Sequence, residues 1–214
     1  MKNVLMIGMG RFGKYTAKKL NEFGHDVMAV DRDEDRINKI MEYVTSARIG
    51  DATDSLFLRT LGIKDFDICI VAVGDAFLES LEITSLLKEL GAEKVISRAT
   101  SATMEKFLLR NGADAVVFPE RQLANWTAIR YSTENIENYI EVSDGYSIYE
   151  VKVPKDWDNK RIDEIDVRRR YGINILGIRN GKMNMNPSYD TVLHRDDSML
   201  VLGRNEELQK MFHL

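Results

Sequence analysis

Cysteine, proline, histidine and long apolar runs are all scarce in this 214-residue sequence. Its single cysteine, Cys69, excludes an internal disulfide and so favours a cytoplasmic protein. No apolar run approaches the roughly 18–20 residues of a membrane-spanning helix. The short apolar run at the N-terminus leads into Gly-Met-Gly-Arg-Phe-Gly instead of a cleavage site, so we expect no signal peptide. The net charge of −4 argues against nucleic acid as the main partner, because a surface that reads phosphates is normally basic.

Residues that usually carry catalysis are equally sparse. None of the three histidines, His25, His194 and His213, follows a strand expected in the first 118 residues. The sequence contains no Gly-x-Ser-x-Gly elbow and no Cys/His zinc spacing. Cys69 lies in the apolar stretch DICIVAVG, which predicts a buried, unreactive thiol. The pattern favours a binding protein over an enzyme, although Lys, Tyr or Asp can also serve as acid or base.

The first 118 residues alternate between apolar runs and helical patterns. Strands are expected at 4–7, 27–30, 47–49, 68–73, 95–96 and 115–118. Such continuous apolar runs are typical of strands covered on both faces, and the alternation predicts a Rossmann-like, doubly wound parallel α/β sheet. The helices between them are expected to bury Ala17, Leu20 and Phe23; Leu78, Leu81, Leu86 and Leu90; and Met104, Phe107 and Leu108.

Beyond this first domain the pattern changes. Residues 119–135 predict a crossover helix that begins at Pro119, and its Leu123, Trp126 and Ile129 or Arg130 could face a partner subunit or pack within the chain. From residue 136 we expect a small α+β domain, 136–214, which would gain core by dimerising. Its expected elements are a hairpin around Ser143-Asp144-Gly145, a helix from Ile162 to Arg170, strands INILGIR and MLVLG, and a terminal helix from Asn205.

The glycines Gly8, Gly10 and Gly13 lie between an expected strand and an expected helix, which is the arrangement of a dinucleotide-binding loop. Gly8 permits a tight turn, Gly10 lets the backbone approach phosphate, and Gly13 lets helix and strand pack closely. Asp31 follows the second strand and is placed to bind a ribose diol. Its carboxylate disfavours the 2′-phosphate of NADP, although Arg32 beside it weakens that exclusion. A bound adenine nucleotide is the favoured interpretation.

Further polar residues fall at the ends of later strands. In GDAT, Asp51 could bind the adenine or cap the next helix, with Thr53 as the rival cap. Arg11 lies inside the glycine loop, where a guanidinium suits an additional phosphate, a neighbouring chain's anion, or simply solvent. Arg98 and Glu120 fall at the same edge of the sheet. They could bind phosphate and a divalent ion respectively, or pair with one another.

Several segments together resemble the cytosolic regulatory subunits of Ktr/Trk potassium uptake systems, which consist of a KTN (RCK-N) and an RCK-C domain. The segments are VLMIGMGRFG, VDRD, IGDAT, VAVGD, VISRA, GADAVVFPE and VRRRYGINILGI, and the resemblance extends over essentially the whole chain. It implies a non-enzymatic protein that dimerises and builds an octameric ring beneath a membrane potassium channel, at the inner face of the membrane. It also implies that ATP and ADP compete for one site, with Arg11 reading phosphate, Asp31 the ribose and Glu120 an associated metal such as Mg²⁺. Some members bind NAD(H) instead.

Two groups of candidate residues follow. The nucleotide site is expected to comprise Gly8, Met9, Gly10, Arg11, Phe12, Gly13, Asp31, Arg32, Asp51, Ala52, Thr53, Ala72, Val73, Gly74, Arg98 and Glu120. The resemblance also implies a cyclic di-AMP site at Arg168, Asn174, Ile175 and Pro187, although the triplet Arg168-Arg169-Arg170 also fits a solvated helix face. A small NAD-dependent oxidoreductase and an NAD(H)-binding redox sensor remain as alternatives.

Overall fold

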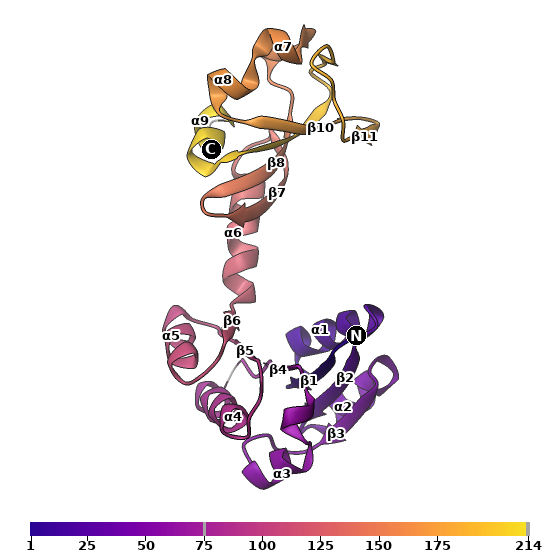
Figure 1. Ribbon diagram of the computed structural model, residues 1–214, viewed down its shortest axis with the longest axis vertical. Coiled ribbons are helices and arrows are strands. Elements are labelled where there is room, and N and C mark those ends of the chain that lie inside the picture. Colours follow the sequence, from indigo (N-terminus) through magenta and orange to yellow (C-terminus); the bar gives the residue numbers. More distant parts are fainter. Residues whose placement is uncertain (75, 213–214) are drawn as a thin grey trace. The chain divides into compact units, whose positions relative to one another are not determined.

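Six short strands of the N-terminal part form one parallel sheet (Figure 1). The computed structural model describes residues 1–74 and 76–212, in two units, Met1–Glu120 and Arg121–Leu214. The strand order is β3-β2-β1-β4-β5-β6. The chain adds β2 and β3 on one side of β1 and then crosses over to add β4, β5 and β6 on the other side, which confirms the predicted doubly wound fold. The strands are β1 (Asn3–Ile7), β2 (Asp26–Asp31), β3 (Ser46–Ile49), β4 (Ile68–Val71), β5 (Val95–Arg98) and β6 (Ala115–Val117).

Helices cover both faces of this sheet. They are α1 (Arg11–Glu22), α2 (Glu34–Ile40), α3 (Ser55–Thr60), α4 (Phe77–Glu89) and α5 (Ala102–Arg110), with short 3-10 turns η1 (Met41–Tyr43) and η2 (Ile63–Asp65). Successive side chains of β1 point to opposite faces, as strand geometry requires. Val4 and Met6 pack in the cluster that contains residues of α1 and α2, whereas Leu5 and Ile7 pack in the cluster that contains residues of α3 and α4. The carboxyl ends of the strands therefore meet at one edge between two helical layers.

Three residues expected on buried helix faces are exposed. Phe23 follows the last residue of α1 and is 66% exposed, and Leu78 in the first turn of α4 is 77% exposed. Phe107 of α5 is 46% exposed. The other three leucines expected on the buried face near α4, Leu81, Leu86 and Leu90, are partly buried and pack against the core. The fully buried residues of α4 are Ser80, Ile83, Thr84 and Leu87.

Thr84, one of the two small polar residues on this face, makes side-chain hydrogen bonds within α4 and to β5. The Thr84 hydroxyl donates to the Ser80 carbonyl at 2.7 Å. It also lies 2.8 Å from the Ser97 hydroxyl, which can donate the second hydrogen bond. A search for apolar periodicity passes over the polar members of this face, Ser80 and Thr84, and it placed Leu78 wrongly on the buried side.

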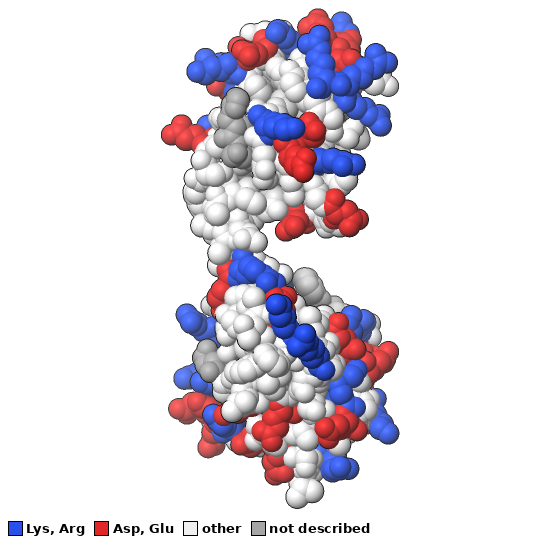
Figure 2. Space-filling model, turned by 90° about the vertical axis from the view of Figure 1, so that its left-hand side faces the viewer, with Lys and Arg blue, Asp and Glu red and all other residues white. Residues whose placement is uncertain are grey.

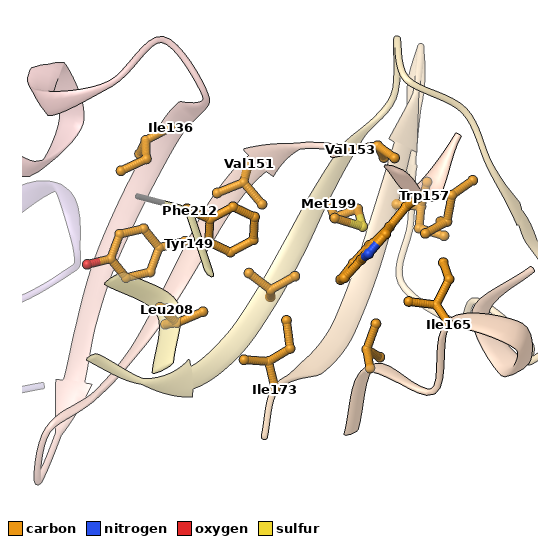
Figure 3. Packing of buried hydrophobic residues seen from close by; sticks show 14 of the residues in the cluster. Ile136, Tyr149, Val151, Val153, Trp157, Ile165, Ile173, Met199, Leu208 and Phe212 are labelled. Carbon is orange, nitrogen blue, oxygen red and sulfur yellow. The ribbon is translucent and has the colours of Figure 1, made fainter. Parts of the chain in front are cut away.

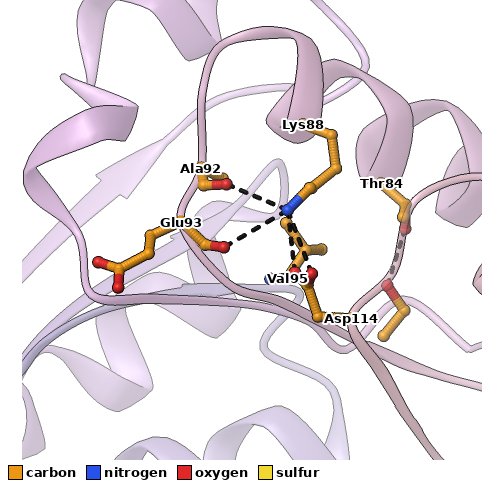
Figure 4. A network of polar contacts seen from close by, with 7 residues as sticks. Thr84, Lys88, Ala92, Glu93, Val95 and Asp114 are labelled. Atoms are coloured by element: carbon orange, nitrogen blue, oxygen red, sulfur yellow. Dashed lines mark hydrogen bonds and ion pairs between the residues drawn. The ribbon is translucent and has the colours of Figure 1, made fainter.

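A polar network ties the end of α4 to the starts of β5 and β6 (Figure 4). The Lys88 ammonium donates to the carbonyls of Ala92 and Glu93 and to the Asp114 carboxylate, which lies 3.0 Å away. Asp114 in turn accepts the Val95 N–H at 2.6 Å. This hydrogen bond, together with the lysine charge, holds the pKa of Asp114 below its ordinary value.

Helix α6 (Pro119–Ser132) crosses the division between the units, and none of its residues is buried. The predicted domain boundaries at residues 118 and 135 stay predictions. The second unit has an antiparallel sheet in the order β11-β10-β13-β8-β7 and a two-stranded sheet of β12 and β9. Its elements are β7 (Ile136–Ser143), β8 (Tyr146–Lys152), η3 (Lys155–Trp157), β9 (Lys160–Arg161), α7 (Ile162–Ile165), α8 (Val167–Tyr171), β10 (Asn174–Asn180), β11 (Lys182–Asn184), β12 (Val192–Leu193), β13 (Ser198–Arg204) and α9 (Asn205–Phe212).

The core of the second unit lies between its large sheet and helices α7, α8 and α9 (Figure 3). Tyr149, Met199 and Ile173 come from the sheet and the segment leading into it, and α9 contributes Leu208 and Phe212. The predicted hairpin is confirmed, and its turn residues Asp144 and Gly145 have φ of 52° and 78°. Two consecutive positive φ values match the twist of a two-residue hairpin, and the sequence Asp-Gly accommodates them.

The prediction of a single helix from Ile162 to Arg170 is wrong. Asp166 has φ of 51° and separates α7 from α8. A residue in the left-handed region ends an α-helix, and aspartate tolerates that conformation better than most residues. Periodicity alone did not show this break, because apolar residues continue on both sides of it.

Candidate functional site

The glycine loop between β1 and α1 packs directly against the segment after β4. Gly8 has φ of 93°, and a Cβ there would lie 3.1 Å from the Val73 side chain. A Cβ on Gly13 would lie 1.9 Å from the Gly8 carbonyl oxygen and 3.2 Å from the Ala72 Cβ. Only glycine fits at position 13, since a side chain cannot overlap a backbone oxygen. The roles predicted for Gly8 and Gly13 agree with this packing.

Gly10 has open space beside it, because a Cβ there would meet nothing within 4 Å. It is the N-cap of α1, and no side chain provides a capping hydrogen bond. The first N–H groups of a helix have no partner within the helix. They form an anion site together with the positive end of the helix dipole. The 12-residue helix α1 therefore offers its first turn to phosphate, with space in front of Gly10.

Asp31 ends β2 next to this loop and is only 7% exposed. Its Oδ2 accepts the Met9 N–H at 2.6 Å, and its Oδ1 accepts the Asp33 N–H at 2.9 Å. The Arg36 guanidinium also reaches Oδ2, at 3.4 Å. The predicted ribose acid is thus at the right edge of the sheet and beside the phosphate loop, but it already has three hydrogen-bond donors.

The segment after β3 lies beside Asp31, since the Gly50 N–H donates to the Asp31 carbonyl at 3.1 Å. Asp51 does not cap α3, and neither does Thr53, so that part of the prediction is wrong. The cap is Asp54, whose side chain accepts the Leu56 N–H. Asp51 instead accepts the Thr53 N–H and hydroxyl at 2.9 and 2.7 Å.

This arrangement makes Asp51 a turn-forming residue. The hydrogen bond from the Thr53 backbone, and then the one from its hydroxyl, hold the pKa of Asp51 below its ordinary value, and the charge of Arg32 acts in the same direction. Asp51 remains exposed and ionised at neutral pH, whereas Ala52 beside it is buried. Arg32 itself pairs with Glu79 of α4 at 3.3 Å.

Arg98, at the end of β5, lies close to the glycine loop. Its side chain is 17% exposed, and its guanidinium lies 5.8 Å from the Phe12 ring centroid. A Cβ on Gly74 would lie 2.4 Å from Arg98 Nη1, so the missing side chain at position 74 makes room for this arginine. The Arg98 Nε is buried and has no hydrogen-bond partner in the part of the chain that the structure describes. The structure therefore brings Phe12, Gly74 and Arg98 together.

Arg98 also pairs with Glu120 in the first turn of α6, with 2.5 Å between Nη2 and Oε1. A hydrogen bond from the residue's own backbone N–H holds the pKa of Glu120 below its ordinary value, and Arg98 and Arg11 lower it further. Arg11 is exposed and lies near enough for its charge to act on Glu120. Two arginines and one carboxylate thus lie beside the N-terminus of α1.

A metal centre requires several ligating side chains gathered at one point. Within residues 1–74 and 76–212, no three His, Cys, Asp or Glu side chains are placed to hold a metal ion. Burial raises the pKa of the Cys69 thiol to about 12, as expected for an unreactive cysteine.

His25 precedes β2, His194 follows β12, and His213 lies outside the described residues. In the same described part, no helix has both the length and the apolar composition that crossing a bilayer requires.

The four residues expected to bind a second ligand are spread over the C-terminal unit. Arg168 is exposed on α8, Asn174 and Ile175 begin β10, and Pro187 lies between β11 and β12. Ile175 packs against the core of the unit. No hydrogen bond or ion pair joins any two of the four within the described residues, so this site stays a prediction.

Arg36 is the residue near the site that the sequence analysis missed. Arg32 was selected because it follows Asp31 directly, but Arg36 is the arginine that reaches the carboxylate. Side chains on a helix point back towards its N-terminus, so an arginine in the first turn of α2 points back towards the end of β2. The spacing Asp31-x-Asp33-x-x-Arg36, read with a helix that begins after Asp33, is the signal that could have found it.

Comparison with known proteins gives consistent matches over most of the chain. The TrkA-N domain model matches residues 4–119, and the TrkA-C domain model matches residues 148–214. Ktr system potassium uptake proteins C and A of Bacillus subtilis strain 168 are 36% and 35% identical to the chain over 210 residues. Each alignment covers 98% of this chain and 95% of the relative.

Solved structures agree on the fold. The GsuK RCK domain superposes with a TM-score of 0.71 at 22% identity, covering 100% of this chain and 47% of that chain. The GsuK channel bound to NAD gives a TM-score of 0.70 at 20% identity, covering 100% and 39% respectively. This chain thus spans less than half the length of either GsuK chain. At these identities the likeness establishes the RCK architecture alone.

Proposed function

Because the chain belongs to the family of Ktr/Trk-type potassium uptake regulatory proteins with a TrkA-N and a TrkA-C domain, we propose that it senses adenine nucleotides and gates a membrane potassium transporter. In this proposal ATP and ADP compete for the site at the carboxyl edge of the parallel sheet. The two ligands stabilise different shapes of a homo-oligomeric ring, built from dimers up to an octamer. The protein catalyses no reaction, and it stays at the cytoplasmic face of the membrane through its partner.

The observation that carries the proposal is the grouping of Arg11 and Arg98 beside the open N-terminus of α1. The helix N–H groups suffice for a pyrophosphate. Two guanidinium groups in addition suit a further phosphate, because arginine binds phosphate oxygens through a planar pair of donors. A γ-phosphate therefore has a recognition group available that ADP would leave unused.

The energies required for such gating are modest. Shifting a two-state ring from 1:99 to 99:1 takes about 5.5 kcal/mol of differential binding. Shared among eight sites, this is under about 1 kcal/mol for each site. One charge-assisted hydrogen bond between arginine and phosphate supplies that amount.

A divalent cation fits this site only together with phosphate. Mg²⁺ commonly takes one or two carboxylates and completes its shell with phosphate oxygens and water. Glu120 supplies one such carboxylate, and its lowered pKa keeps it ionised. To bind the ion, Glu120 must share or give up its contact with Arg98.

An apolar surface on α4 and α5 supports assembly of several copies. Phe77 and Phe107 pack edge to face with centroids 5.9 Å apart, and Leu78 beside them is 77% exposed. An open groove of about 460 Å³ follows the same helix and is lined by Leu78, Leu81, Glu82, Ser85, Leu86, Glu89 and Asn111. Figure 2, which views the side where α4 and α5 lie in Figure 1, shows a broad area of uncharged side chains on the N-terminal unit. Exposed apolar side chains gathered in a largely uncharged area are typical of a protein interface.

Two further ligands are part of the proposal. Cyclic di-AMP would bind the C-terminal unit at Arg168, Asn174, Ile175 and Pro187, between two copies of the chain. NAD(H) is the alternative occupant of the nucleotide site, which would make the protein a redox sensor. The buried acid Asp31 beside a glycine loop suits the adenosine half of NAD as well as it suits ATP, and a GsuK channel of the same fold was solved with NAD.

Calorimetric titration tests the proposal. The nucleotide-stripped protein is titrated with ATP, ADP and NADH, with and without Mg²⁺. Micromolar binding of ATP and ADP, with mutual competition, is the expected result. Binding of NADH alone would overturn ATP/ADP sensing and favour the redox alternative. Hydride transfer to any added substrate would contradict a purely regulatory role.

A further inference from the structure

The Asp31 carboxylate has too few free acceptor positions for a ribose. A carboxylate offers about four lone-pair positions, two on each oxygen. Three are taken by the N–H groups of Met9 and Asp33 and by the Arg36 guanidinium. A ribose diol donates two hydrogen bonds, from its 2′ and 3′ hydroxyls, so one of the present contacts must be given up.

The three donors differ in how easily they can leave. Met9 and Asp33 donate from backbone N–H groups, at 2.6 and 2.9 Å, and both belong to segments fixed by the sheet and by α2. Arg36 donates from a side chain that is 52% exposed, and its contact is the longest at 3.4 Å. Water competes for the half-exposed guanidinium, although the Asp31 carboxylate is buried, so this long ion pair contributes little. Arg36 is therefore the donor that yields.

Asp33 provides a second anchor that keeps Arg36 over the carboxylate. Arg36 Nε lies 3.3 Å from Asp33 Oδ2, while Asp33 Oδ1 accepts the Arg36 N–H at 3.2 Å as the cap of α2. The guanidinium thus lies between two carboxylates, one buried and one exposed. Its position is set by the start of α2 and does not depend on a nucleotide.

We propose that Arg36 is a specificity-determining residue that competes with the nucleotide's ribose for Asp31. The side chain covers the carboxylate in this structure and has to swing away before both ribose hydroxyls can bind. Arg36 thereby reduces the affinity gained from the ribose, while the phosphates remain the main source of binding. This inference rests on the proposed nucleotide site and adds a competitor within it.

The test compares ADP with 2′,3′-dideoxy-ADP, titrated into the full-length, nucleotide-stripped protein. Both ligands carry the same adenine and diphosphate, so any effect of the Arg36 charge on the phosphates cancels in the ratio of their Kd values. In Arg36→Gln we expect the preference for ADP over the dideoxy analogue to rise about two- to fivefold, the range of a half-exposed ion pair. A preference that is unchanged or smaller overturns the proposal.

Two more variants guard against a folding artefact. Asp33→Asn keeps a capping oxygen for α2 but removes the charge that anchors Arg36, so the preference should rise in the same direction by a smaller factor. Arg110→Gln removes an exposed arginine on α5 and should leave the preference at the wild-type value. The proposal is overturned if the preference for ADP rises as much in Arg110→Gln as in Arg36→Gln. If Arg36→Gln does not fold, the proposal is overturned when the preference does not rise in Asp33→Asn. If the wild-type protein binds neither ADP nor ATP, the proposed ATP/ADP sensing is overturned. If ADP binds and the ratios do not change, only the role of Arg36 is overturned.

Discussion

The carboxylate of Glu120 accepts a hydrogen bond from the guanidinium of Arg98, 22 positions earlier in the chain, at 2.5 Å. The pair links the end of β5 to the first turn of α6 within the N-terminal unit. It also holds two residues of the predicted nucleotide site in mutual contact. A ligand that binds either residue therefore acts on both.

Replacing Glu120 by glutamine should separate its effect on phosphate from its effect on metal. Without divalent ions, Glu120→Gln should bind ATP about two- to threefold more tightly, because a carboxylate that repels the phosphates is lost. The increase in affinity that Mg²⁺ gives the wild type should disappear. Calorimetry in EDTA and in Mg²⁺ measures both effects, and Glu93→Gln, on the exposed loop before β5, serves as the control. A full Mg²⁺ effect in Glu120→Gln would contradict the metal role.

Alanine at Gly13 should mainly lower the stability of the fold, whereas alanine at Gly10 should mainly weaken nucleotide binding. Gly13→Ala should destabilise the fold by about 3 kcal/mol or more, because its Cβ would overlap the Gly8 carbonyl. Gly10→Ala should cost less than about 1 kcal/mol, since the space in front of it is open. It should nevertheless weaken ADP binding at least tenfold, because the methyl group would stand where phosphate approaches. Thermal unfolding and calorimetry on both variants make the comparison, and unchanged ADP binding in Gly10→Ala would show that phosphate lies elsewhere.

Arg11 is expected to distinguish three phosphates from two. In Arg11→Gln the affinity for ATP should fall to that for ADP, while ADP binding stays within about twofold of the wild type. Competition titrations of both nucleotides provide the measurement. Arg59→Gln, an exposed arginine on α3, is the matched control. An equal loss for ATP and ADP would mean that Arg11 contributes only general charge.

Asp114→Asn tests the network at the end of α4. The amide oxygen can still accept the Val95 N–H, but the charge opposite Lys88 is lost, so we expect a destabilisation of about 0.5–1.5 kcal/mol at pH 7. The pKa of Asp114 is lowered in the folded protein, so the unfolded chain takes up the proton first as pH falls. The advantage of the wild type is therefore complete above the ordinary pKa of 3.8 and is lost as pH drops below it. Urea unfolding of both proteins at neutral and acidic pH measures this, and a gap that does not change with pH would exclude the ion pair as its cause.

Leu78→Asp should weaken assembly without unfolding the chain. Leu78 is 77% exposed, so its loss removes little core, but a charge in the apolar α4–α5 surface should oppose burial against another copy. Sedimentation velocity should show smaller particles at equal concentration. Leu56→Asp changes a leucine of similar exposure on α3 and should assemble like the wild type. Identical sedimentation of both variants would place the interface elsewhere.

The parallel sheet and the shape of the glycine loop could be predicted because their signals are local. Gly8, Gly13 and Asp31 sit at strand ends that the apolar runs mark, and parallel strands bring those ends together. The hairpin at Asp144-Gly145 followed from two residues whose backbone preferences select one turn.

Other features depend on three-dimensional choices that the sequence leaves open. Asp51, Thr53 and Asp54 are all residue types that can cap a helix. The backbone begins α3 directly after Asp54, which makes Asp54 the cap. Arg32 and Arg36 both follow Asp31 closely, and the direction of α2 decided which one reaches it. The pairing of Arg98 with Glu120 was one of two options that only geometry could separate.

The edge strand β7 carries a practical consequence. It is the last strand of its sheet, so one side of its backbone has no neighbouring strand in the described part of the unit. Ile140 and Val142 on this strand are 55% and 52% exposed, and Glu141 is the charged residue between them. Exposed apolar edge strands recruit further strands into aggregates, and a charge on the edge opposes this. Glu141 is therefore the residue to preserve when this protein is concentrated, stored or re-engineered.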